Sequence, residues 1–172
     1  MLFRSGVFLL TAALITRSGI LARRDPGRPI NKAMREALNA KNPQFSTDDA
    51  MLIAKTYGSA HKLPSGLQYV VRANGSDEAT PAPGEEVICH YDGRLLDGTP
   101  FDSSYKRGAP FTFRVGSGGV IRGWDEAFAT MRKGEKRTLI IPYWLAYGEK
   151  GRPPTIPPKA TLIFEVELID WR

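Results

Sequence analysis

The sequence predicts an α+β domain in which an antiparallel sheet of five short strands wraps over one helix. Three observations lead to this fold class. From Lys62 onward the hydrophobic residues follow a strand period, Gly- and Pro-rich turns separate the short runs, and only residues 123–131 have a helical period. The chain therefore reads as one well-buried domain preceded by a modest extension.

The predicted strands are short and each ends at a turn. They cover residues 67–72, 85–91, 111–115, 136–141 and 161–170. The last strand alternates, so that Leu162, Phe164, Val166 and Leu168 share one face. We expect Trp124, on the predicted helix, and Phe164 to lie between helix and sheet.

Residues 1–28 form a leader of a different composition. Residues 1–24 contain no acidic side chain, and an apolar run from Val7 to Ile15 continues past Arg17 to Ala22. The core of this run has the length of a signal-peptide apolar region, whereas a membrane span needs about 20 apolar residues. A signal peptide, an organelle transit peptide and a short retained anchor all stay open. We expect a membrane-associated or organellar protein, mitochondrial or secretory, rather than a freely cytosolic one.

Residues 29–61 are predicted to form a helical extension. Residues 30–41 place Ile30, Met34 and Leu38 on one face, and a second helix, residues 50–60, follows the capping run 46–49. Isolated helices shorter than about 12–15 residues are marginal in water, so these helices need a docking surface. The surface could belong to the main domain, to a second copy in a homodimer, or to a partner in a larger complex.

Charge and residue types exclude several classes of function. The net charge is +6, but residues 1–28 hold five arginines and one acid, which leaves 19 basic and 17 acidic side chains in the rest. A mixed surface of this kind does not predict nucleic-acid binding. One cysteine, Cys89, and two separate histidines give no disulfide framework and no metal site, and the glycine-rich run 116–119 lacks the lysine of a phosphate loop. We expect no metal and no cofactor, and a buried, inert Cys89.

The remaining signal is a series of aromatic and aliphatic residues that describes a small apolar pocket. It consists of Tyr91, Phe101, Phe111, Phe113, Val120, Ile121, Trp124, Ala146, Tyr147, Ile156 and Phe164. None of these side chains is an activated nucleophile. A pocket built from them acts by desolvating its ligand and fixing the ligand's shape.

Five runs in this region resemble the FKBP-type peptidyl-prolyl isomerases in order and spacing. They are residues 90–93, 98–104, 120–124, 145–148 and 156–162. Residues 63–69 also resemble the domain entry of the macrophage infectivity potentiator branch. The resemblance covers residues 62–172 and implies a half-barrel sheet of five to six strands around one short helix, with a pocket for a prolyl ring.

The resemblance also implies roles for individual residues. Trp124 would form the pocket floor, and Arg107 would orient Asp102. The walls would be Tyr91, Phe111, Val120, Ile121 and Phe164, and the rim Phe101, Asp102, Ala146, Tyr147 and Ile156. The catalytic set would then be Tyr91, Phe101, Asp102 and Tyr147, with Phe113 among the residues that bind substrate.

The function implied is cis-trans isomerisation of Xaa-Pro bonds in polypeptides during folding, with a macrolide as a further ligand. The alternative is a non-catalytic FKBP-like binding subunit of a larger membrane assembly. Two segments depart from the family pattern: Tyr143–Trp144, and the rim-loop residues 152–155. Both bear on macrolide affinity and sequence preference more than on catalysis.

Overall fold

The computed structural model describes residues 44–76 and 79–172. These described residues belong to one compact unit. The leader and the predicted helix 30–41 lie outside the described residues.

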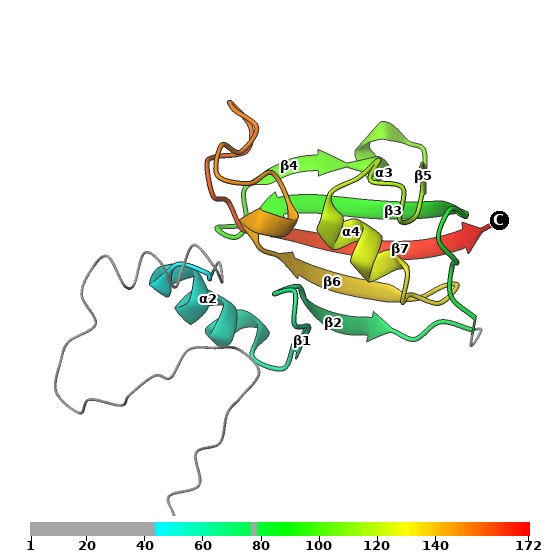
Figure 1. The fold of residues 1–172 in the computed structure, drawn as a ribbon, viewed down its shortest axis with the longest axis horizontal. Helices are drawn as coiled ribbons and strands as arrows, with labels where there is room; N and C mark the ends of the chain where they lie inside the picture. The colour runs from blue at the N-terminus through cyan, green and yellow to red at the C-terminus, as the bar shows by residue number, and fades with distance from the viewer. Residues whose placement is uncertain (1–43, 77–78) are drawn as a thin grey trace, which may run out of the picture. The chain divides into compact units, whose positions relative to one another are not determined.

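A seven-stranded antiparallel sheet forms the body of the domain (Figure 1). The strand order is β1-β2-β6-β7-β3-β4, and β5 pairs with the first half of β3 on the same edge as β4. The strands are β1 (His61–Lys62), β2 (Gln68–Ala73), β3 (Glu86–Leu95), β4 (Pro100–Ser103), β5 (Phe111–Arg114), β6 (Lys136–Ile141) and β7 (Leu162–Trp171). The helices are α2 (Thr47–Tyr57), α3 (Ser104–Arg107), α4 (Arg122–Phe128) and the 3-10 turn η1 (Tyr143–Leu145).

Helix α4 lies against one face of this sheet at very short range (Figure 1). A Cβ atom on Gly123 would come within 2.5 Å of Ile141 Cγ2 on β6. Glycine fits where the helix meets the strand, because a Cβ atom there would force the Ile141 side chain to move. This approach buries Trp124, Ala127 and Phe128 of α4 in the core.

The core follows the alternation that the sequence predicts for β7. Leu162, Phe164, Val166 and Leu168 are all buried in the cluster beneath α4, and Trp124 lies there with Phe164 as expected. Buried cysteine was also expected, and Cys89 is fully inaccessible.

Helix α2 packs on the opposite face of the sheet. Ile53 forms a second buried cluster with Ile140 and Ile163, whose neighbours in β6 and β7 face the main core. Asp49 Oδ2 accepts a 2.6 Å hydrogen bond from Thr161 Oγ1, just before β7. Of the docking surfaces left open by the sequence, the main domain of the same chain is the one that this helix contacts.

The predicted cap of α2 is present, although the helix is shifted along the chain. The Ser46 hydroxyl accepts from the Asp49 amide at 3.1 Å, and two acids stand in the first turn. The helix begins at Thr47 and ends at Tyr57, three residues before the predicted bounds at each end. The cap residue decides the start, since its side chain satisfies an amide that has no partner within the helix.

The expectation of a single helical stretch in the domain was wrong. Helix α3 and the turn η1 are also helical, and β4 is a strand that the sequence pattern missed. Each is only three or four residues long, too short for a hydrophobic period to show. Strand β4 also begins with Pro100 and lies at the sheet edge, the position where a strand tolerates proline.

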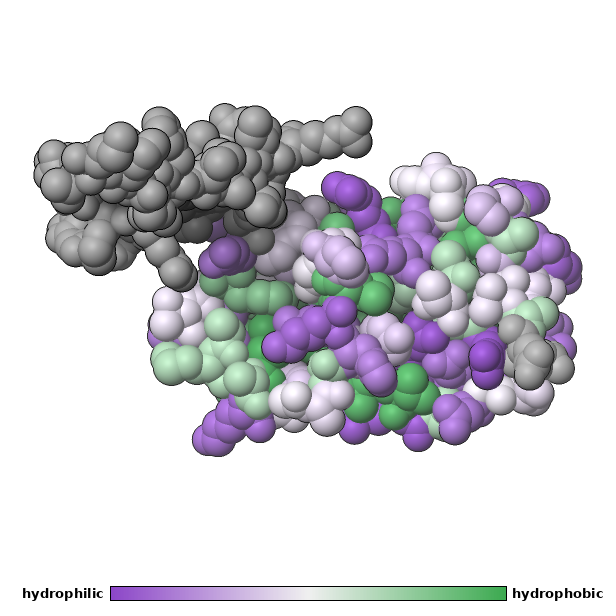
Figure 2. All heavy atoms as spheres, turned by 60° about the horizontal axis from the view of Figure 1, so that its bottom comes forward, coloured by the Kyte–Doolittle hydropathy of each residue, from purple (hydrophilic) through white to green (hydrophobic). Residues whose placement is uncertain are grey.

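The surface of the described residues mixes polar and apolar side chains. On the face shown in Figure 2, small hydrophobic patches lie between hydrophilic residues. The large hydrophobic side chains that are exposed are Met51 and Leu52 on α2, and Tyr105 on α3. No helix within residues 44–76 and 79–172 has the length and hydrophobicity to cross a membrane.

Two buried groups predict how stability depends on alkaline pH. Burial raises the pKa of the Cys89 thiol from 9.0 to about 12, and burial with the Asp102 hydrogen bond raises the pKa of Tyr91 from 10.0 to about 12. Above the unfolded pKa values, the unfolded chain binds fewer protons than the native one, so the free energy of unfolding falls as pH rises toward 12.

We expect urea midpoints to be flat near neutral pH and to drop from about pH 9 upward. The variant Cys89→Ala should move the onset upward by about one pH unit, because only the tyrosine share then remains. Midpoints that stay constant up to about pH 11 would contradict this account.

Candidate active site

The predicted aromatic residues enclose a pocket between α4, the strands β3, β4, β5 and β7, and the loops that flank η1. Its volume is about 280 Å³. It is lined by Tyr91, Phe101, Asp102, Phe111, Gly119, Val120, Ile121, Trp124, Tyr147, Arg152 and Phe164. A space of this size accepts a small ring with part of the chain on either side of it.

Trp124 forms the floor of the pocket and is only 4% exposed. Three rings meet the indole edge-on, with centroid distances of 4.9 Å for Tyr91, 5.2 Å for Phe164 and 5.9 Å for Phe111. Edge-to-face contacts add about 0.5–1.5 kcal/mol each beyond burial. The floor is thus held in one orientation before any ligand arrives.

The wall formed by Phe101 and Phe164 depends on a glycine behind it. Their rings pack edge-on at 5.4 Å. A Cβ atom on Gly93 of β3 would lie 2.7 Å from Phe164 Cε1 and 2.9 Å from the Phe101 ring. Both rings lean into space that any larger residue would fill, so Gly93 sets the position of this wall.

One corner of the pocket is polar, and its hydrogen bonds are satisfied internally. Tyr91 donates from its hydroxyl to Asp102 Oδ2 at 2.5 Å. Arg107 bonds Asp102 Oδ1 and also donates to the Tyr91 hydroxyl at 2.7 Å, while the Ser103 amide donates to Asp102 Oδ1 at 2.8 Å. Burial, followed by the Asp102 hydrogen bond, raises the pKa of Tyr91 to about 12. The phenol therefore stays protonated at neutral pH and serves as a fixed dipole.

A carboxylate on α4 holds the loop that supplies two wall residues. Asp125 accepts hydrogen bonds from the amides of Gly116 at 2.8 Å and Gly118 at 3.1 Å. The run 116–119 lacks the lysine of a phosphate loop, as the sequence shows. Two of its amides bind a carboxylate of the same domain, and the next two residues, Val120 and Ile121, line the pocket.

Most of the predicted site residues line the pocket, and four take other positions. Phe113 lies behind the wall, 8% exposed and stacked on Phe111. Ile156 is buried in the core, Ala146 packs against that core, and Arg107 acts through its contacts with Asp102 and Tyr91.

Two lining residues were not assigned to the site from the sequence, Gly119 and Arg152. Arg152 belongs to the rim loop that departs from the family pattern. This departure was the one sequence feature that could have pointed to Arg152 as a site residue. The sequence could not show that the loop folds back over the pocket.

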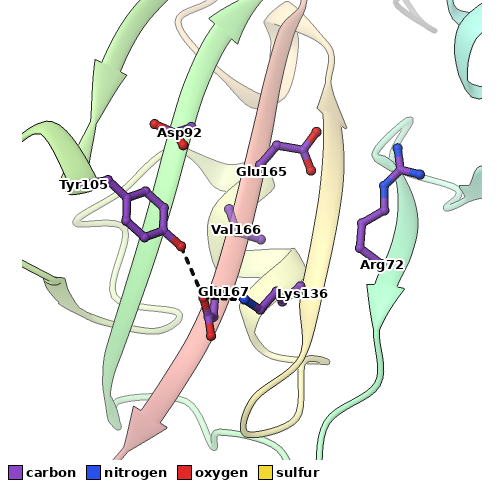
Figure 3. A pocket seen from close by; sticks show the side chains of 7 residues that line it. All are labelled: Arg72, Asp92, Tyr105, Lys136, Glu165, Val166 and Glu167. Carbon is purple, nitrogen blue, oxygen red and sulfur yellow. Dashed lines mark hydrogen bonds and ion pairs between the residues drawn. The ribbon is translucent and has the colours of Figure 1, made fainter.

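A second hollow, of about 440 Å³, lies on the outer side of the sheet (Figure 3). Tyr105 and Lys136 both reach Glu167 there, at 3.2 Å and 3.0 Å. Arg94 and Thr138 occupy the two oxygens of Glu165 in the same way. The walls of this hollow are mostly charged, and it has no buried aromatic floor, so the smaller aromatic pocket is the better candidate for desolvating a ligand.

Fold and pocket together define a small α+β domain whose apolar pocket has the size of a compact ring. The family model described as FKBP-type peptidyl-prolyl cis-trans isomerase matches residues 77–169. The Arabidopsis thaliana protein "Peptidyl-prolyl cis-trans isomerase FKBP15-2" is 46% identical over 125 residues, which cover 73% of this chain and 75% of that protein. The chain therefore belongs to the FKBP-type peptidyl-prolyl cis-trans isomerases and is an enzyme that isomerises Xaa-Pro bonds.

Two further comparisons agree with this family. "FK506-binding protein 4" of Dictyostelium discoideum is 52% identical over 115 residues, which make up 67% of this chain and 31% of that protein. The structure titled "Crystal structure of AtFKBP13" superposes with a TM-score of 0.62 at 40% identity, covering 66% of this chain and 98% of that one. The half-barrel fold is thus confirmed. The macrophage infectivity potentiator branch stays a prediction.

The aromatic wall yields a prediction at Gly93. In Gly93→Ala the new methyl group must displace Phe101 or Phe164, and overpacking of this kind typically costs about 1–3 kcal/mol. We expect about a tenfold loss of kcat/KM on an Xaa-Pro peptide, together with a lower urea midpoint. The matched control is Asp92→Ala, one residue earlier on β3, because Asp92 is exposed and faces the outer hollow. Equal activity of both variants would show that the wall does not need this close approach.

Proposed function

We propose that the aromatic pocket is where this enzyme isomerises Xaa-Pro bonds, with the prolyl ring seated on Trp124. The supporting observation is the closed set of edge-to-face rings around an indole that is 4% exposed. Tyr91, Phe111, Val120, Ile121 and Phe164 form the walls in this proposal. Phe101, Asp102 and Tyr147 form the rim.

The reaction needs a change in relative stability rather than a proton transfer. Amide resonance holds the peptide bond planar with a barrier of about 18–20 kcal/mol. At the twisted midpoint the resonance is lost and the carbonyl oxygen carries less charge. An apolar pocket disfavours the polar planar amide relative to the twisted one, and each 1.4 kcal/mol or so of such differential binding gives about a factor of ten in rate.

Tyr147 is proposed to fix the substrate at the rim. It lines the pocket and is half buried, so its hydroxyl can donate to a substrate carbonyl beside the prolyl ring. Asp102 has both oxygens engaged by Tyr91, Arg107 and the Ser103 amide. It therefore shapes the polar corner and does not act as a general base in this proposal.

The proposal for Tyr147 is tested by Tyr147→Phe. Loss of one hydrogen bond worth about 0.5–1.5 kcal/mol should lower kcat/KM roughly two- to tenfold. The control is Tyr143→Phe, four residues earlier in η1, whose ring packs on Trp144 and does not line the pocket. Exchange NMR on a proline peptide measures both variants without a coupling protease. Equal loss in both variants would remove Tyr147 from the site.

Trp124→Leu tests the floor. We expect a larger loss of activity than in Tyr147→Phe and a lower stability, since Trp is a core residue as well. If the wild-type chain shows no rate above the uncatalysed background, the pocket is not an active site, and the non-catalytic binding module becomes the better interpretation.

Macrolide binding is a further part of the proposal. The name of the Dictyostelium relative states that it binds FK506. The aromatic pocket of this chain offers a surface for an apolar ring of such a ligand. Arg152 at the rim distinguishes the site, and affinity measured by competition against the peptide assay would show how far the rim tolerates a macrolide.

The cellular setting is proposed from the leader alone. Its acid-free, apolar composition suggests delivery to a membrane or organelle, where the enzyme would assist the folding of proline-containing proteins. A homodimer or a larger complex through residues 29–61 stays an open prediction.

Sequencing of the mature N-terminus tests the leader. A start near residues 23–30 in a soluble fraction would show that the leader is a targeting peptide that is cleaved off. A start at Met1 or Leu2 in a carbonate-resistant membrane fraction would show a retained anchor. Recovery of uncleaved protein from the soluble cytosol would contradict both.

A further inference from the structure

The aromatic pocket carries one charge that the isomerisation does not use. Among its lining residues, Asp102 and Arg152 are the charged ones. Asp102 is neutralised by Arg107 and bonded by Tyr91. No ion pair found within residues 44–76 and 79–172 involves Arg152. The pocket mouth therefore has a net positive charge supplied by one side chain.

The backbone holds Arg152 in place. Its amide donates to the Ile156 carbonyl at 2.8 Å, and the Ile156 amide donates back to the Arg152 carbonyl at 3.0 Å. Ile156 is 4% exposed and belongs to the main core. Arg152 thus projects from a short bridge anchored on a buried residue, which keeps its charge at the rim rather than on a freely moving loop.

Other charges close to it in the sequence do not cancel this one. Glu149 pairs with Lys159 at 3.4 Å, and Lys150 is exposed and does not line the pocket. A substrate whose proline occupies the pocket must place the neighbouring residues at its mouth, because consecutive Cα atoms are only about 3.8 Å apart.

We propose that Arg152 is a specificity-determining residue that favours substrates with Asp or Glu next to the isomerised proline. The proposal rests on the proposed function of the same pocket. Arginine suits this role, since its planar guanidinium can donate two parallel hydrogen bonds to a carboxylate and keeps its charge at any physiological pH. A lysine beside the proline would meet like charge and bind less well.

The expected size of the preference for Glu over Lys follows from the exposure of Arg152. Exposed ion pairs are worth about 0.2–1 kcal/mol, which corresponds to roughly 1.4- to fivefold in kcat/KM. Attraction for Glu and repulsion of Lys both raise the Glu/Lys ratio, so a ratio of about two to twenty-five is expected. Salt should lower this ratio, because the Debye length falls from about 10 Å at 0.1 M to 3 Å at 1 M.

The experiment uses the full chain and two peptide series with Glu, Gln or Lys, one series before the proline and one after it. Exchange NMR gives kcat/KM for each peptide, and the Glu/Lys ratio within one enzyme variant is the readout. A ratio cancels any general loss of activity. We expect the ratio to exceed two in at least one series, to fall to about one in Arg152→Ala, to reverse in Arg152→Glu and to persist in Arg152→Lys.

The matched control is Lys150→Ala, which removes an equal charge from the same loop away from the pocket. Its Glu/Lys ratio should equal that of the wild-type chain. The proposal is overturned if the wild-type ratio is one in both series, if Arg152→Ala leaves the ratio unchanged, or if Lys150→Ala lowers it equally.

The Gln peptides separate this result from the isomerase proposal. Normal turnover of Gln peptides without a Glu/Lys preference would overturn the role of Arg152 alone. Absence of turnover with every peptide would overturn the pocket as an active site, and with it the basis of this inference.

Discussion

The packing of Trp124 is the constraint on which the rest of this structure depends. The indole joins the core of the domain to the floor of the pocket, so it must be buried and yet present one surface to a ligand. Gly123 makes this geometry accessible, because it lets α4 approach Ile141 more closely than any side chain would permit. Tyr91, Phe111 and Phe164 then meet the ring from β3, β5 and β7. The stability of the domain and the shape of the pocket therefore rest on the same contacts.

The ends of α4 are fixed by polar contacts that complement this packing. At the first turn, Asp125 binds the loop amides that precede the pocket wall. Just after the helix, the Thr130 carbonyl accepts from Arg137, whose guanidinium also pairs with Glu135 in a site where both residues are about 5% exposed. A buried pair of this kind contributes positioning more surely than stability. The helix can thus neither rotate nor slide without breaking satisfied hydrogen bonds.

The division of charge around the pocket explains how an isomerase can have both an apolar site and a charged rim. Asp102 and Arg107 neutralise each other beside Tyr91, so the interior offers fixed dipoles without a free charge that would stabilise the planar amide. The charge of Arg152 lies at the mouth, where water screens it. In the role proposed for it, Arg152 selects among substrates there and leaves the low polarity of the floor intact.

By itself, the sequence predicted the fold class, five of the strands and most of the residues that line the pocket. The alternation of β7 placed Phe164 on the core side, because a strand period is visible along the chain. The floor and walls were predicted from the resemblance of the ordered motifs to the FKBP family, and the residues named for them line the pocket. The sequence could not give the short elements β4, α3 and η1, nor the docking of α2 through Ile53. Only the tertiary structure showed that Phe113 lies behind the pocket wall and that Arg152 reaches the mouth of the pocket. It also showed that Gly93 makes room for the rings of Phe101 and Phe164. These features depend on contacts between segments far apart in the chain, and no local pattern encodes such distances.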